Sequence, residues 1–310
     1  MKRKIIKQGN NSFTITLPRQ WLNKYSLTAS DELEVVEQGN KLTISFEKEI
    51  DVEKHVEIDA DRTSDLLKRI LHSVYRTGYD EIRINYRKAG AIKSVLDILN
   101  DFMIGFEVLE QGKNHCVLKN ITHPRDIEFE SLLKRTFSMI ISMGQDLLNS
   151  IINKDMDGIV DARQSEIVNN RITSFCRRYI NKKTLETIPK TTSVYSLIEY
   201  LEEIADQYKF ICLYFINNNK LLNESFDKNF IKIFQSVNDQ FANFYELFYK
   251  FDINKSVVHN QVRKKLIEEI ISKFDKGKRY EIRIMNNLLS ITQNISNALL
   301  LKLAIEEFKR

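Results

Sequence analysis

Residues 1–48 alternate hydrophobic and polar positions with the period of two that is typical of half-buried β-strands. Phe13, Ile15 and Leu17 alternate with hydroxylated residues, and Pro18 ends this strand because it has no N–H for a sheet. A tight turn is expected at Gly9, since glycine tolerates positive φ. The pattern predicts a helix and four short strands: helix 20–25, strands 2–8, 12–17, 32–38 and 41–46. Such a small core would be marginal alone, so we expect a second chain to complete it.

After residue 51 the hydrophobic pattern changes. Short segments with two apolar residues in alternation, typical of strands, are interspersed with longer segments whose apolar residues are spaced three and four apart, typical of helices. It predicts the order β-α-β-α-β-β, with Gly78 as the C-terminal cap of the first helix. The expected elements are strands at 56–58 and 82–84, helices at 63–77 and 91–102, and a hairpin of 106–110 and 115–120. This order predicts a small α/β domain.

Long helical periodicity dominates from residue 126 onward, where the chain contains only three glycines, Gly144, Gly158 and Gly277. Apolar residues spaced three and four apart predict six helices: 127–153, 156–182, 193–219, 224–251, 255–275 and 279–309. Long helices with short connections are typical of an up-and-down antiparallel bundle, here as two groups of three. The expected fold class is therefore multidomain α+β, with a β head at 1–50, an α/β domain at 51–123 and a six-helix bundle at 124–310.

Composition narrows the class of protein. Among the 310 residues 43% are hydrophobic and 29% charged, which excludes intrinsic disorder. Cys116, Cys176 and Cys212 are odd in number and widely spaced, so a disulfide framework is not expected. No apolar run approaches the ~18 residues of a membrane span. We therefore expect a cytoplasmic protein without membrane insertion.

The positive charge is concentrated at one end of the chain. Residues 1–24 contain no acid and six basic residues: Lys2, Arg3, Lys4, Lys7, Arg19 and Lys24. The net charge is +5, so the other residues sum to −1. Such a cluster favours a polyanionic partner, because neutralised phosphates release counterions. Charge alone does not distinguish DNA from RNA, from an anionic membrane or from a solvated terminus.

The run from Gln8 to Trp21 places a Gly, a Ser, an aromatic residue, an alternating strand, Leu-Pro, a basic residue and a Trp in a fixed order. It resembles the AbrB/SpoVT/MazE swapped-hairpin DNA-binding domain, although Ser30 replaces the family's usual Gly. The resemblance implies a homodimer through the N-terminal domain that binds double-stranded DNA. The expected DNA-binding residues are Lys2, Arg3, Lys4, Lys7 and Arg19. Alternatively, the head only dimerises the chain.

The helical tail resembles the PhoU family of phosphate-signalling proteins, which have two three-helix repeats. With the head, this is similar to a group of archaeal PhoU-type regulators. That family collects metal ions on E-x-x-x-D motifs. Glu202 and Asp206 have this spacing, and Glu166 is followed at the same distance by Asn170. The resemblance implies a metal site at Glu166, Glu202 and Asp206, holding at most one weakly bound divalent or iron-type ion; no cofactor is required.

In the second repeat, the positions where the resemblance implies metal-binding acids are Ser290 and Asn294, neither of which is an acid. The alternative for Glu202 and Asp206 is a solvated carboxylate pair balanced by Lys209. Two carboxylates at i and i+4 share one helix face, so either reading fits their spacing.

The sequence contains no recognisable catalytic motif. The five histidines lie in different predicted elements, and no nucleophile triad or phosphate-binding glycine loop is present. We therefore predict a dimeric, non-enzymatic DNA-binding transcription regulator, linked by resemblance to phosphate uptake or homeostasis. The alternative is a phosphate-signalling adaptor that binds a transporter or kinase through its bundle and uses the head only to dimerise.

Overall fold

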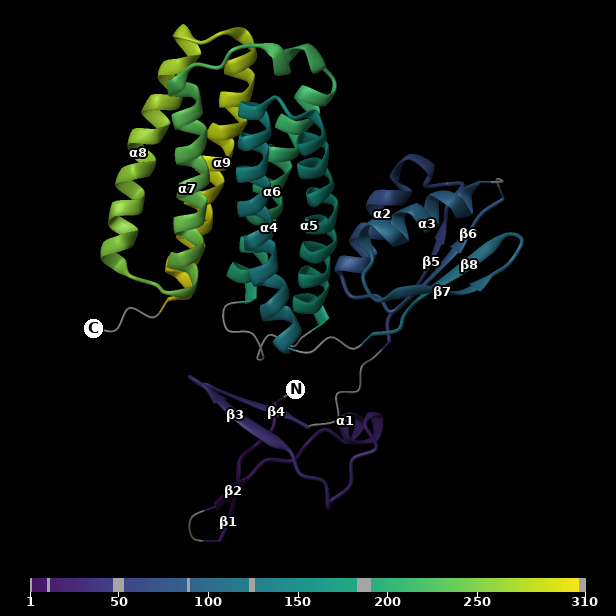
Figure 1. The fold of residues 1–310 in the computed structure, drawn as a ribbon. Coiled ribbons are helices and arrows are strands. Elements are labelled where there is room, and N and C mark those ends of the chain that lie inside the picture. The colour runs from purple at the N-terminus through teal and green to yellow at the C-terminus, as the bar shows by residue number, and fades with distance from the viewer. Residues whose placement is uncertain are drawn as a thin grey trace. The chain divides into compact units, whose positions relative to one another are not determined.

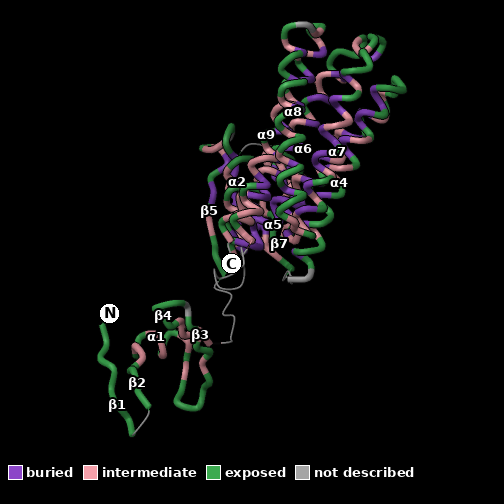
Figure 2. The backbone as a smooth tube through the Cα atoms, turned by 90° about the vertical axis from the view of Figure 1, so that its left-hand side faces the viewer, coloured by how far each residue is buried: buried purple, intermediate pink, exposed green. Residues whose placement is uncertain are grey.

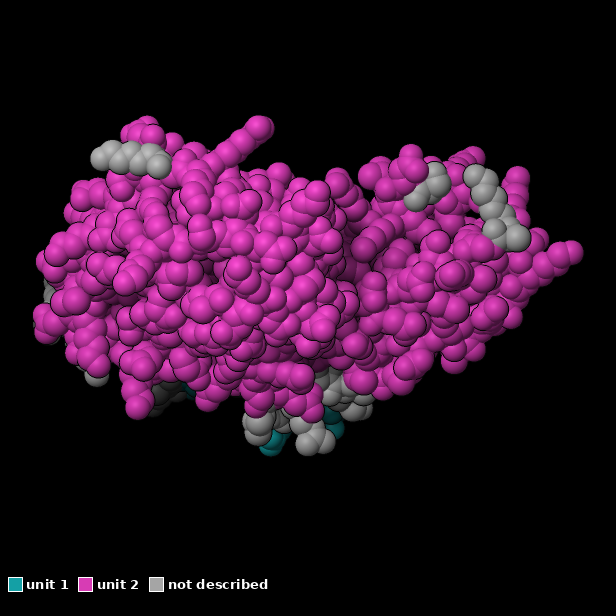
Figure 3. All heavy atoms as spheres, turned by 45° about the horizontal axis from the view of Figure 1, so that its top comes forward, with its two compact units in different colours: residues 1–52 teal, residues 53–310 magenta. Residues whose placement is uncertain are grey.

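The protein was analysed as a computed structural model that describes residues 2–9, 12–46, 53–87, 90–122, 126–182 and 191–306. The chain forms two compact units, residues 1–52 and residues 53–310 (Figure 3). The first unit is the head. The second unit contains both the α/β domain and the helical bundle, so the boundary expected near residue 123 lies inside one compact body.

The head consists of two hairpins and a short helix: β1 (Ile6–Gln8), β2 (Ser12–Thr14), α1 (Arg19–Lys24), β3 (Glu34–Gln38) and β4 (Lys41–Ser45) (Figure 1). β1 pairs with β2, and β3 pairs with β4, both antiparallel. The first two strands are shorter than predicted, because their pairing extends only from Ile6 opposite Thr14 to Gln8 opposite Ser12. Gly9 has a φ of +74°, as its predicted turn requires, whereas Asn10 and Asn11 lie outside the described residues.

The head has no apolar core of its own within residues 2–9 and 12–46. None of these residues whose burial is described is buried, and Figure 2 colours them as exposed or intermediate. Phe13 is 66% exposed, and Leu42 is 68% exposed. The sequence prediction that this segment cannot form a sufficient core by itself agrees with these exposures.

The α/β domain contains a four-stranded mixed sheet covered on one face by two helices. Its elements follow the predicted order: β5 (His55–Asp59), α2 (Leu67–Arg76), β6 (Glu81–Asn85), α3 (Ala91–Phe102), β7 (Phe106–Gln111) and β8 (His115–Asn120). The sheet order is β5-β6-β8-β7, and only β5 and β6 are parallel.

The core of the α/β domain lies between the sheet and its helices. Leu71 and Val95 of the helices and Ile82 and Ile84 of β6 are fully buried there. The alternation along β6 gives one apolar face, as the sequence predicted. Gly78, with a φ of +91°, follows the end of α2 as the expected glycine stop. Both helices also pack on the bundle helix that begins at Met156 (Figure 1).

Six long helices form the bundle: α4 (Asp126–Asn153), α5 (Met156–Lys182), α6 (Thr191–Ile216), α7 (Lys228–Tyr249), α8 (Ile253–Lys276) and α9 (Arg279–Ile305). The predicted number and order of helices are confirmed for the described part of the chain. A short 3-10 turn at Asn219–Asn223, absent from the prediction, links α6 to α7. Phenylalanine side chains along one face of α7 lie in the bundle core, where Phe230, Phe234 and Phe244 are fully buried.

The bundle is an internal repeat, which the spacing of buried positions makes visible. α4, α5 and α6 correspond to α7, α8 and α9, respectively. Matching buried pairs are Phe137 and Leu147 with Phe234 and Phe244, Ala162 and Thr173 with His259 and Ile270, and Leu201 and Tyr208 with Leu288 and Ile295. Within each pair of helices, the difference in residue number between the matched positions assigns a residue of the second repeat to a helical residue of the first.

α9 is apolar enough to be compared with a membrane span. Among the described residues it meets the length and composition of such a span, with a mean hydropathy of 1.3 over its most apolar window. Core helices of soluble bundles meet the same criterion. Ile284, Leu288 and Ile291 of α9 are fully buried, and α9 packs against α6, α7 and α8. Its apolar face therefore belongs to the bundle core.

Candidate functional site

The basic residues of the head all lie at its surface. Lys2, Arg3 and Lys4 precede β1, Lys7 lies in β1, and Arg19 opens α1 directly after Pro18; all five are exposed. No ion pair joins any of them to an acid among the residues that the structure describes. Arg3 and Arg19 therefore each present a guanidinium whose N–H donors suit phosphate oxygens or base edges.

The strands bring only part of this basic set together. The β1–β2 ladder runs from Ile6 opposite Thr14 to Gln8 opposite Ser12, so it holds Lys7 opposite Phe13. It ends before Lys4, so it does not pair the first residues with the segment leading to Arg19. Within one chain, the β1–β2 ladder therefore includes Lys7 but neither Lys4 nor Arg19.

Glu202 of α6 lies against arginines of α2 and α5. Its carboxylate accepts hydrogen bonds from Arg76 Nη2 at 3.1 and 3.3 Å and from Thr173 Oγ1 at 2.7 Å. Arg177 Nη1 lies 2.9 Å from Glu202 Oε2, and Arg177 is fully buried. The nearby Glu199 forms a second ion pair, at 2.7 Å from Arg177 Nε.

Glu166 and Asp206 share a lysine. Lys209 Nζ lies 3.0 Å from Glu166 Oε1 and also forms an ion pair with Asp206. Arg163 Nη1 lies 3.0 Å from Glu166 Oε2, and Asn170 Nδ2 donates to Glu166 Oε1 at 2.5 Å. The structure therefore places Glu166 and Asp206 on one lysine, but it gives Glu202 separate partners. We call Glu166, Glu199, Glu202 and Asp206 the acid row.

Burial and neighbouring cations act in opposite directions on these carboxyls. Burial raises the pKa of Glu166, and the Lys209 ammonium opposes this. Burial would also raise the pKa of Glu202, but the guanidinium groups of Arg177 and Arg76 hold that pKa below its usual value. Glu202 is therefore an ionised carboxylate at neutral pH, matched by two guanidinium cations.

The residues present do not fit a metal ion. A hard cation needs several oxygen ligands whose negative charge is available, whereas each carboxylate of the acid row already contacts an arginine or lysine of the chain. Within the described ranges no three His, Cys, Asp or Glu side chains converge as metal ligands. The side-chain amide of Asn169, which is buried, makes no hydrogen bond there, but a neutral amide adds no charge.

Asp80 forms a second polar contact between the α/β domain and α5, which the sequence analysis missed. Arg178 Nη2 donates to Asp80 Oδ1 at 2.7 Å, and Lys182 Nζ lies 2.6 Å from the same oxygen. The Arg178 guanidinium carbon lies 5.3 Å from the ring centroid of Tyr75 and 4.9 Å from that of Phe106. A signal was present in the sequence, since Arg177 and Arg178 interrupt a helix stretch that is otherwise apolar or small.

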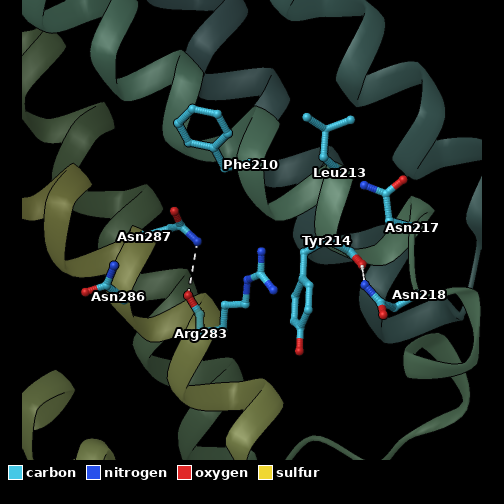
Figure 4. Close-up of a pocket in the computed structure, with 8 residues that line it drawn as sticks. All are labelled: Phe210, Leu213, Tyr214, Asn217, Asn218, Arg283, Asn286 and Asn287. Atoms are coloured by element: carbon cyan, nitrogen blue, oxygen red, sulfur yellow. Dashed lines mark hydrogen bonds between the residues drawn. The ribbon is translucent and has the colours of Figure 1, made fainter.

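A surface pocket of about 380 Å³ lies between α6 and α9. Figure 4 shows the Arg283 side chain reaching into it beside Tyr214, with Phe210 and Leu213 across from it. The Arg283 guanidinium carbon lies 4.4 Å from the Tyr214 ring centroid. None of the residues proposed from sequence lines this pocket.

Comparison with known proteins identifies the head. The family described as "Antidote-toxin recognition MazE, bacterial antitoxin" matches residues 6–51. The head is therefore a domain of MazE/AbrB type, which confirms the resemblance found in the sequence. A domain of this type implies DNA binding and dimerisation in general.

The helical region resembles a solved structure, the phosphate transport system regulatory protein PhoU from Streptococcus pneumoniae. The two share 15% sequence identity with a TM-score of 0.44, and the match covers 58% of this chain and 95% of that chain. The likeness concerns the arrangement of helices. No curated protein matches the sequence.

Proposed function

We propose that this chain is a dimeric, non-enzymatic transcription regulator whose head binds double-stranded DNA. The observation that carries this proposal is the surface of the head: five exposed basic residues without described acidic partners, on a domain in which no residue of described burial is buried. The exposed apolar side chains support pairing of two heads, and the basic residues support a phosphate backbone as the ligand.

Electrostatics favours the head as the DNA-binding part. The first 24 residues carry six positive charges and no acid, while the remainder of the chain sums to −1. A duplex would therefore be attracted to this end rather than to the bundle. Arg3 and Arg19 are the proposed bidentate donors, with Lys2, Lys4 and Lys7 as point charges.

A gel shift with the full chain and with residues 53–310 tests this function. A pool of genomic duplex fragments at two salt concentrations serves as the probe. The full chain should shift the pool, and more weakly at the higher salt, because phosphate contacts release counterions. Residues 53–310, which contain both buried cores, should not shift it. Binding by both proteins, or by neither, contradicts the proposal.

The phosphate link is the finer part of the proposal, and it rests on the resemblance of the helical sequence pattern to the PhoU family. Mapping of bound sites in cells grown with high and low phosphate tests it. Occupancy at genes of phosphate uptake that changes with phosphate supply is expected. Sites that are unrelated to phosphate, with unchanged occupancy, would leave a DNA-binding regulator of another signal.

The adaptor alternative is favoured by one observation on the bundle. The outward side of α8 carries exposed apolar side chains, among them Val257 at 51% and Val258 at 57% exposure. In that reading the bundle binds a transporter or kinase, and the head only dimerises the chain. A dimeric full chain that fails to shift any duplex would support the adaptor over the regulator.

A further inference from the structure

The acid row is electrically balanced by side chains of the protein itself. Its four carboxylates face four cations: Arg76, Arg163, Arg177 and Lys209. His72, one turn before Arg76 on α2, adds no charge at neutral pH, because burial and the neighbouring Arg76 lower its pKa to about 4. No unbalanced negative charge is left in this row to attract a divalent cation.

One of the four cations comes from a different domain. Arg76 lies in the last turn of α2, and its guanidinium reaches Glu202 on α6 and Ser174 Oγ on α5, the latter at 3.1 Å. Asn181 Nδ2 donates to the backbone carbonyl of Arg76 at 2.7 Å. The α/β domain thus binds the bundle through a side chain that ends in the acid row.

A second anchor fixes the same face of α5. Residues at positions 174, 178 and 181 share one side of this helix, since they follow at intervals of four and three. All three contact the α/β domain, with Arg178 bound to Asp80 and stacked near Tyr75. Two charged contacts at separate points hold a domain in one orientation, whereas a single contact would allow rotation.

The second repeat has no counterpart of the acid row. By the spacing of buried positions, Glu166, Glu202 and Asp206 correspond to Arg263, Leu289 and Gln293. These positions lie one residue before the expected Ser290 and Asn294, and they also contain no acid. At these three positions the second repeat therefore offers no carboxylate, either as a metal ligand or as an ionic partner for a guanidinium.

We propose that the acid row of the first repeat is the docking site of the α/β domain, with the guanidinium groups of Arg76 and Arg177 standing in place of a metal ion. Glu202 is the acceptor that links α2, α5 and α6. The α/β domain therefore moves with the first repeat as one body. This assignment does not depend on whether the head binds DNA.

Metal analysis of the wild-type full chain is the first test. The protein is incubated with Mn²⁺, Fe²⁺ or Zn²⁺, freed of unbound metal, and measured by elemental analysis beside Glu202→Gln. No stoichiometric metal is expected in either protein. One ion per wild-type chain that is lost in Glu202→Gln would overturn the proposal.

Hydrogen exchange of the full chain is the second test, and it detects docking directly. Arg76→Ala should speed exchange in α2 and in the last two turns of α5 by about tenfold, the factor of one charge-assisted hydrogen bond. Arg69→Ala is the matched control, since Arg69 is an exposed arginine of the same helix. Arg76→Gln provides a milder second variant.

The two Arg76 variants and the Arg69→Ala control decide the outcome together. Faster exchange in both Arg76 variants, with Arg69→Ala unchanged, supports the docking role. Equal exchange in Arg76→Ala and Arg69→Ala would show that Arg76 does not hold the α/β domain, and it would refute the proposal.

Discussion

Gly144 in α4 lies close to side chains of two other bundle helices, Tyr208 of α6 and Asn238 of α7. Tyr208 Oη donates to Asn238 Oδ1 at 2.7 Å, and Asn238 Nδ2 donates to the carbonyl of Gly144 at 2.9 Å. A Cβ atom at this position would lie 2.8 Å from both Asn238 Oδ1 and Tyr208 Oη. The glycine thus allows a buried polar contact among α4, α6 and α7.

Gly144→Ala should lower the free energy of unfolding by about 1–3 kcal/mol, the usual cost of overpacking. This would occur although alanine favours helices by about 1 kcal/mol over glycine. Urea unfolding followed by circular dichroism measures the change. Ser138→Ala, an exposed position of the same helix, should shift stability by less than about 0.5 kcal/mol. A stabilised Gly144→Ala protein would contradict this packing.

Asp80 should make stability depend on pH. Burial raises its pKa, but hydrogen bonds from Lys182 and the Lys54 N–H, with the Arg178 charge, hold that pKa below its ordinary value of 3.8. The ionised carboxylate therefore stabilises the fold above about pH 4, and this contribution is lost as pH falls through the folded pKa. Asp80→Asn should cost about 3–5 kcal/mol at pH 7, because it removes the carboxylate charge that pairs with buried Arg178.

Urea unfolding at several pH values tests this prediction. The stability difference between wild type and Asp80→Asn should shrink as pH drops below 4. Glu107→Gln removes an exposed carboxyl from the same domain and should have little effect at any pH. A wild-type advantage that is as large at pH 3 as at pH 7 would count against ionised Asp80 as its source.

At the scale of elements, the extended segment around β1 and the start of α1 should carry the DNA contacts. Arg3→Ala and Arg19→Ala should each weaken duplex binding and reduce the slope of log K against log salt by about one unit per lost phosphate contact. Arg279→Ala, an exposed arginine in the first turn of α9, should leave the slope unchanged. Fluorescence anisotropy across a salt series measures it, and an unchanged slope in both head variants would favour the adaptor function.

Element order was predictable because local patterns determine it. The period of two in β6 and the period of 3.6 in α4 to α9 follow from which side chains a strand or helix buries. Element ends were less predictable. The strand expected at 12–17 stops at Thr14 because pairing, rather than alternation, defines a strand, and its partner β1 begins only at Ile6.

At the scale of the whole molecule, the head should make the full chain a dimer. Sedimentation equilibrium should show a dimer for the full chain and a monomer for residues 53–310, which bury their own apolar clusters. Phe13→Glu should weaken the dimer, since this ring is exposed in the single chain. Phe210→Glu alters an exposed ring of the bundle and should not. A monomeric full chain at micromolar concentration contradicts the swapped-hairpin arrangement.

The sequence alone determined the periodicities, the basic cluster and the resemblance of the head, because these depend on neighbours along the chain. The partners of the Glu202 carboxylate were decided only by the tertiary structure. Its spacing from Asp206 suits a metal pair, but its partners Arg76 and Arg177 lie 126 and 25 positions earlier in the chain and meet it only after α2, α5 and α6 pack. A buried carboxylate takes whichever cation folding brings to it, and spacing within one helix cannot show which cation that is.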